Sequence, residues 1–244
     1  MRTFVLWFGL VACGGPNEAT LIEELRIVAA VAEPPEAAIG ETYDLTVTVA
    51  DPLQLGGDWL VWSCIPELEG IPVEPGCVRQ AGTLDGETFT VPAAVVGPLP
   101  VYVMACNPGK CDLPGATDAQ LEDPNAWLTE LPFSGVALAR RFTRVAEGEE
   151  RRENPVVEEV TLDKESVKTE GELTLSFVTP GAETAYGYAT GGGFTMGSFD
   201  VGESGNAELV WVAPEDAGGY RLYVVFEDGE GGTVVWTSDV QVTK

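Results

Sequence analysis

Hydrophobic and polar residues alternate with a period of two along several stretches of the chain. In the segment 43–49, three aliphatic side chains alternate with Thr46 and Thr48. That period is typical of a β-strand with one buried face. Similar patterns predict further strands at 25–32, 58–64, 87–91, 99–106 and 134–145. The pattern therefore favours an all-β fold.

Residues 113–132 interrupt the strand pattern and are interpreted as an insertion. A short helix is predicted at 125–131, because Asp123 is a good N-cap and Pro124 fits the first helical position. Trp127 lies on this helix. It marks a possible binding insert, because loops on a rigid scaffold often carry recognition. The alternative is that Trp127 and Leu128 pack the insertion onto the rest of the domain.

The second half of the chain repeats features of the first. Residues 45–52 align with 173–180, and residues 101–103 align with 222–224 in the same order. Between the two copies, residues 147–155 are strongly charged and contain no apolar residue before Pro155. We therefore predict two domains, 24–146 and 156–244, joined by an acidic linker at 147–155.

The segment Asp216–Leu222 resembles the immunoglobulin-superfamily pattern Asp-x-Gly-x-Tyr-x-Cys, with Leu222 in the place of the cysteine. Residues 211–232 also look like the Ig-like repeats of bacterial surface and periplasmic lipoproteins. The resemblance implies two Ig-like β-sandwiches in tandem. It also implies that Tyr220 is a tyrosine corner, whose hydroxyl bonds to nearby backbone.

The N-terminus combines one positive charge, an apolar run and the residues Leu10-Val11-Ala12-Cys13. This resembles the lipobox of bacterial lipoproteins. The resemblance implies a signal peptide at 1–12, cleavage after Ala12, fatty acylation (including palmitate) of Cys13, and a lipidated tether at 13–23. Gly14 is not the aspartate of the inner-membrane retention signal, which implies the outer membrane, on its periplasmic or its surface side. The alternative is a buried N-terminal strand or helix with an incidental cysteine.

Four cysteines remain after Cys13, and an even number in an exported protein predicts two disulfides. We favour the pairs Cys64 with Cys77 and Cys106 with Cys111. The residues 107–110 place Pro and Gly at the centre of a type II turn, which brings the last two cysteines together. A zinc site with four thiolate ligands is the alternative.

Composition narrows the possible chemistry. The chain has 29 Gly and 17 Pro, which suits short strands joined by turns, and its net charge of -26 disfavours nucleic-acid partners. Attraction to a membrane is therefore expected to come from acyl chains on Cys13. The chain contains no histidine, which excludes Ser-His-Asp and Cys-His catalytic sites.

We expect a non-catalytic adhesion or recognition module of the cell envelope, with an unknown protein or glycan partner and no cofactor. The alternative is a structural subunit of a periplasmic assembly, docking through a sheet edge. A hydrolase that uses a carboxylate pair is a third possibility. The acidic linker and residues 228–232 could bind calcium, but a solvated charged linker and a Gly-rich hairpin turn are the favoured explanation.

Overall fold

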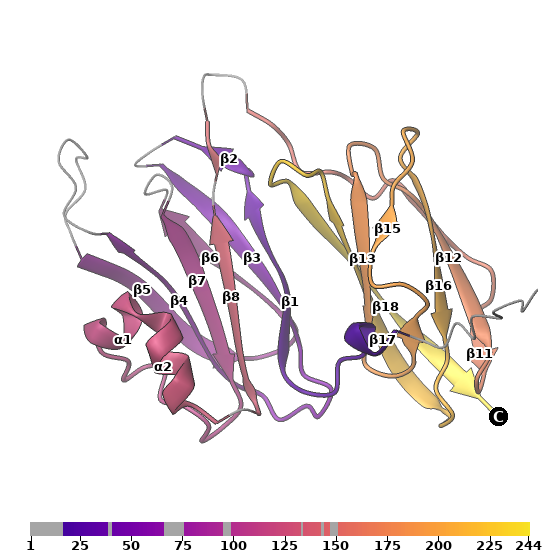
Figure 1. Ribbon diagram of the computed structural model, residues 1–244, viewed down its shortest axis with the longest axis horizontal. Coiled ribbons are helices and arrows are strands. Elements are labelled where there is room, and N and C mark those ends of the chain that lie inside the picture. The colour runs from indigo at the N-terminus through magenta and orange to yellow at the C-terminus, as the bar shows by residue number, and fades with distance from the viewer. Residues whose placement is uncertain are drawn as a thin grey trace, which may run out of the picture.

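The computed structural model describes residues 17–38, 41–65, 76–94, 99–132, 134–142, 144–146 and 151–244. The signal peptide, Cys13 and part of the predicted linker lie outside these ranges. Figure 1 shows two β-sandwiches side by side along the long axis of the molecule. Within the described residues, none of the helices has the length and apolar character needed to cross a membrane.

The first sandwich consists of two antiparallel sheets and a two-stranded parallel pair. Its sheets are ordered β1-β3-β6 and β5-β4-β7-β8, and the pair is β2-β9. The bounds are β1 Arg26–Glu33, β2 Glu36–Ala37, β3 Thr42–Ala50, β4 Gly57–Ile65, β5 Gly76–Leu84, β6 Thr88–Ala94, β7 Pro100–Cys106, β8 Val136–Phe142 and β9 Arg144–Val145. Alternate residues of the facing strands fill its core, including Leu45, Val47 and Val103.

The second sandwich has sheets ordered β10-β12-β16-β14 and β11-β18-β17-β13-β15. The bounds are β10 Glu159–Leu162, β11 Ser166–Lys168, β12 Glu172–Val178, β13 Thr184–Ala189, β14 Gly193–Phe194, β15 Phe199–Asp200, β16 Asn206–Val212, β17 Gly218–Glu227 and β18 Thr233–Thr243. Its core contains more aromatic rings than the first, with Phe177, Phe194, Phe226 and Trp211 all buried.

The two sandwiches share one topology. The order β1-β3-β6 in the first corresponds to β10-β12-β16 in the second, and β4-β7-β8 corresponds to β13-β17-β18. The two aligned segments of the sequence repeat therefore start on equivalent strands, β3 with β12 and β7 with β17. Paired antiparallel sheets in this order form the Ig-like sandwich, so the predicted fold class is confirmed.

The insertion lies between β7 and β8 and contains two short helices, α1 (Asp118–Glu122) and α2 (Pro124–Glu130). In α2, Asp123 is the N-cap and accepts a hydrogen bond from the Ala126 amide, as its sequence predicts. The pattern did not predict α1, which begins with a capping box between Thr117 and Gln120. It also did not predict β5, where the alternation of exposed and half-buried positions is broken between Val78 and Arg79.

Candidate functional site

The insertion covers the outer face of the sheet β5-β4-β7-β8 of the first sandwich. Trp127 is only 4% exposed and packs against Trp62, with ring centroids 6.1 Å apart. The Trp62 indole nitrogen donates to the carbonyl of Leu121, at 3.0 Å. Trp127 therefore fills a small core beneath the insertion. The prediction of Trp127 as a possible binding residue is therefore corrected, because its ring is buried and is not presented to solvent.

Both expected cysteine pairs are bonded in the structure, Cys64 to Cys77 and Cys106 to Cys111. The first joins neighbouring strands β4 and β5, and the second closes the start of the insertion. Between the second pair, the Lys110 amide donates to the Asn107 carbonyl at 3.1 Å, and Gly109 has a positive φ of 72°. These are the features of a type II turn, which requires glycine at its third position.

Tyr220 lies near the start of β17, where the chain enters the sheet β11-β18-β17-β13-β15. Its hydroxyl donates to the Asp216 carbonyl at 2.9 Å, the contact expected of a tyrosine corner. The ring lies against Gly191, where an added Cβ would approach the ring to 2.2 Å. Leu222, which stands in the place of the family's cysteine, is fully buried. Tyr220 therefore has a structural role in the second sandwich.

We call residues 17–25, which precede the first sandwich in sequence, the N-terminal segment. Residues 17–22 lie against the second sandwich, whereas Leu25 packs into the core of the first. The Asn17 amide donates to the Phe194 carbonyl at 2.8 Å, and the Ile22 amide donates to the Ala189 carbonyl at 2.7 Å. In return, the Phe194 amide donates to the Thr20 hydroxyl at 2.9 Å. Residues 17–22 were expected to belong to a polar tether, but backbone pairing holds them to the second sandwich.

A small apolar cluster joins the N-terminal segment to both sandwiches. It consists of Ile22, Ala50 at the end of β3, and Tyr223 of β17, all at most 2% exposed. Beside it, the guanidinium of Arg26 lies 4.5 Å from the centre of the Tyr188 ring, a cation–π contact between β1 and β13. This cluster makes the junction between the sandwiches a packed interface.

Charged groups surround this cluster. Arg221 of β17 pairs with Asp239 at 2.6 Å and reaches across the junction to Glu87 at 2.5 Å. Burial raises the pKa of Glu87, and the positive charge of Arg221 opposes that rise. Burial likewise raises the pKa of Tyr223, and the Glu87 carboxylate adds to the rise. The tyrosine therefore stays neutral and hydrogen-bonds the carboxylate.

The described part of the linker is attached to both sandwiches. The Asn154 side-chain amide donates to the Ala32 carbonyl at 2.8 Å, and its oxygen accepts from the Thr233 amide at 2.8 Å. From the first sandwich, Arg141 donates to the Thr233 hydroxyl at 3.3 Å and to the Gly231 carbonyl. Asn154 and Arg141 thus connect β1 and β8 to the hairpin between β17 and β18.

Two arginines of the linker, Arg151 and Arg152, form ion pairs with glutamates of the sandwiches. Arg151 makes two hydrogen bonds to Glu41, and this pairing lowers the pKa of Glu41 from its ordinary 4.5 to about 2. Arg152 forms ion pairs with Glu36 of the first sandwich and Glu230 of the second. No sequence signal identified these contacts, because their members lie far apart in the chain and fit no motif.

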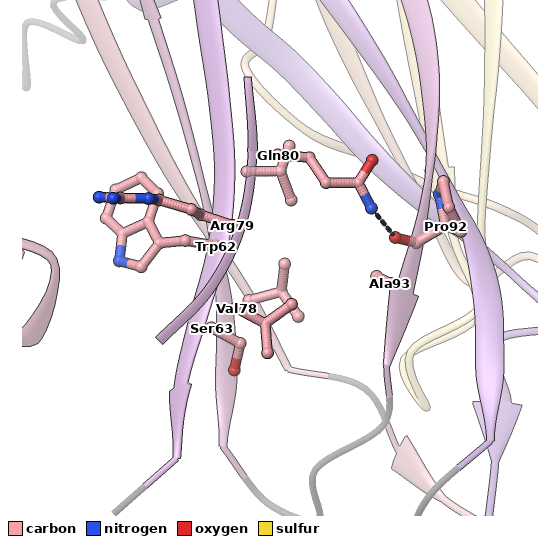
Figure 2. Close-up of a pocket in the computed structure, with 9 residues that line it drawn as sticks. Trp62, Ser63, Val78, Arg79, Gln80, Pro92 and Ala93 are labelled. Atoms are coloured by element: carbon pink, nitrogen blue, oxygen red, sulfur yellow. Dashed lines mark hydrogen bonds between the residues drawn. The ribbon is translucent and has the colours of Figure 1, made fainter. Parts of the chain in front are cut away.

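The first sandwich has an open side where the edge strands β5 and β6 face each other. Figure 2 shows the cleft there, with Gln80 of β5 donating to the carbonyl of Pro92 of β6 at 2.8 Å. Its volume is about 40 Å³, whereas a site for a small organic ligand needs at least ~300 Å³. Val78 on the same edge is 58% exposed. This side therefore suits contact with a protein segment better than enclosure of a substrate.

The acidic hairpin at residues 228–232 is closed by its own hydrogen bonds. The Asp228 carboxylate accepts hydrogen bonds from the amides of Glu230 and Gly232, both at 2.8 Å, and so closes its own hairpin. Over the described ranges, three or more metal-ligating side chains do not gather at any one point. A hairpin turn accounts for residues 228–232.

No protein family matches this chain, and no curated protein does. Among solved structures, the D0-D1 domain of intimin is 11% identical, with a TM-score of 0.31 over 89% of this chain and 99% of that one. The adhesin InvE of Yersinia pseudotuberculosis is 12% identical, with a TM-score of 0.29 over 96% and 61%. A transglutaminase of red sea bream is 13% identical, with a TM-score of 0.29 over 91% and 32%. Scores this low support no conclusion about activity, so the assignment of the Ig-like fold rests on the strand order described above.

Proposed function

We propose that this chain is a membrane-anchored cell-envelope lipoprotein whose two Ig-like sandwiches act as a non-catalytic adhesion or recognition module. The observation that carries the proposal is the open edge of the first sandwich. Strand β5 is nine residues long and is the outermost strand of its sheet. Its backbone and the exposed side chain of Val78 can pair with an extended segment of a partner.

Two further features support this proposal. The lipobox at Leu10–Cys13 supports anchoring, because acyl chains on Cys13 would hold an otherwise acidic protein to a membrane. The packed junction supports a role in holding β5 ready for a partner. A binding edge on a rigid pair of domains loses less conformational entropy when the partner binds. The carboxylates that pack at the junction are engaged in ion pairs and hydrogen bonds. They therefore do not support the hydrolase alternative.

The anchor is tested by substituting Cys13→Ser in the full chain. We expect loss of radiolabelled fatty-acid incorporation and release from the membrane fraction. Continued labelling would overturn the lipobox assignment. A useful matched control is Cys111→Ser, which removes a cysteine of the insertion and should leave acylation intact.

The alternative, a structural subunit of a periplasmic assembly, uses the same edge but a different compartment. Protease treatment of intact cells distinguishes the two, with an immunoblot against residues 233–244 as the readout. Loss of the signal supports a recognition module exposed on the cell surface. Protection until the envelope is permeabilised supports the periplasmic subunit.

A further inference from the structure

The N-terminal segment determines where an anchor on Cys13 would emerge from the folded molecule. Cys13 lies four positions before Asn17, whose backbone is hydrogen-bonded to Phe194 of the second sandwich. At ~3.5 Å per residue, the acylated cysteine lies within ~14 Å of that point. An anchored membrane surface must therefore lie close to Asn17, at the start of the described N-terminal segment.

Some of the exposed apolar side chains lie on loops that adjoin this segment. Five large hydrophobic residues of the described chain are exposed: Leu53 at 62%, Leu55 at 52%, Val78 at 58%, Val156 at 60% and Met196 at 53%. Three of them lie on loops that adjoin residues in contact with the N-terminal segment. Met196 is next to Gly197, where an added Cβ would lie 3.2 Å from the Asn17 side chain.

The other two lie on the loop 51–56 of the first sandwich. This loop begins directly after Ala50, which packs with Ile22 in the junction cluster. The Asp51 carboxylate accepts a hydrogen bond from the Gly56 amide at 2.8 Å, and the Gln54 amide donates to the Asp51 carbonyl at 2.9 Å. These bonds close the loop, so that Leu53 and Leu55 are held at its tip.

We propose that the face formed by Met196, Leu53 and Leu55 around the N-terminal segment contacts the lipid surface. This inference rests on the proposed anchoring at Cys13. The polar headgroup layer is ~5–7 Å deep on each side of a bilayer, which is enough to receive such side chains. The anchored molecule then contacts the membrane through both sandwiches at their junction. The open edge of β5 and the insertion on the first sandwich stay accessible to partners.

The test uses the full-length acylated protein in phosphatidylcholine vesicles, with a fluorophore on one introduced cysteine. The test variants are Leu53→Cys and Met196→Cys, and the matched controls are Val78→Cys and Val156→Cys, which are equally exposed and apolar. A nitroxide on the lipid headgroup should quench the labels at 53 and 196 and leave those at 78 and 156 bright. Equal quenching at all four positions, or stronger quenching at 78, would overturn the inference.

A second variant tests whether the N-terminal segment sets this position. Thr20→Val removes the hydroxyl that accepts from the Phe194 amide. We expect the segment to be held less tightly on the second sandwich, and quenching at 196 to fall although the protein still floats with the vesicles. The control Glu23→Gln, at an exposed position of the same segment, should keep full quenching. Unchanged quenching in Thr20→Val would contradict the inference, and a wild-type protein that does not float would overturn the anchor itself.

Discussion

Replacing Trp127 with alanine tests whether the insertion is held by its own small core. Trp127 is 4% exposed, and it packs on Trp62 within a cluster on the outer face of the sheet. An aromatic side chain of this size buries ~150–250 Å², and at ~25 cal/mol per Å² its removal costs ~4–6 kcal/mol. Measured substitutions of buried Trp or Phe by Ala give ~3–5 kcal/mol, which agrees.

That loss should melt the insertion and leave the two sandwiches folded. The cluster beneath the insertion is separate from the inner core of the first sandwich, so the insertion can open locally. Under native conditions, we expect protease cleavage within residues 112–132 to become much faster in Trp127→Ala. The fluorescence of Trp62, which the insertion covers, should shift toward that of a solvated indole.

The matched control is Asn125→Ala, at an exposed position of the same helix. It should leave both the cleavage rate and the fluorescence unchanged. If Trp127→Ala and Asn125→Ala were cleaved at the same rate, the cluster would not be what holds the insertion, and a ligand-binding role for the ring would return as the better explanation.

Three smaller effects follow from single contacts. Tyr220→Phe removes one hydrogen bond and should lower the free energy of unfolding by ~1 kcal/mol in urea titration, and no change would contradict the tyrosine-corner role. Arg151→Ala should raise the pKa of Glu41 from about 2 toward its ordinary 4.5 in a carboxyl NMR titration. The folded-state pKa is depressed, so the stabilisation by this pair is present above pH 4.5 and is lost as pH falls toward 2. A Glu41 pKa that does not change in Arg151→Ala would refute the pairing. A double-mutant cycle on Glu87 and Arg221 should give a coupling energy below ~1 kcal/mol, since both side chains are about a third exposed, and a much larger value would mean that the pair is shielded from water.

The strands were the part of the fold most readable from the sequence. In β12, and in β3 as far as Val47, one face is buried and the other is more exposed, so burial alternates and the period of two is visible. Strand β5 was missed because it is an edge strand with one fully buried residue, Leu84, and its half-buried positions are Cys77, Gln80 and Gly82. Its residues therefore carry no alternation of hydrophobic and polar types.

The N-terminal segment was misjudged for a different reason. Residues 14–20 are small or polar, which is the composition of a tether, and only Ile22 and Leu25 of the segment are buried apolar residues. Backbone hydrogen bonds to Phe194 and Ala189 hold it, and backbone pairing leaves no mark on composition. The junction was not predicted either, because Asn154 and Arg141 contact residues that lie far away in sequence.

The path of the chain has a consequence for cooperativity. The described part of the chain starts against the second sandwich at residues 17–22, forms the first sandwich, and returns through residues 151–155, which bond to both. Separating the sandwiches therefore requires breaking the backbone pairing of Ile22 with Ala189, the Asn154 bridge and the Glu87–Arg221 pair together. Each of these contacts is weak alone, but because they lie on one interface, they must be lost in one step. The two domains that the repeat defines in sequence thus behave as one unit at their junction, which would give a partner bound at β5 a fixed position relative to an anchored membrane.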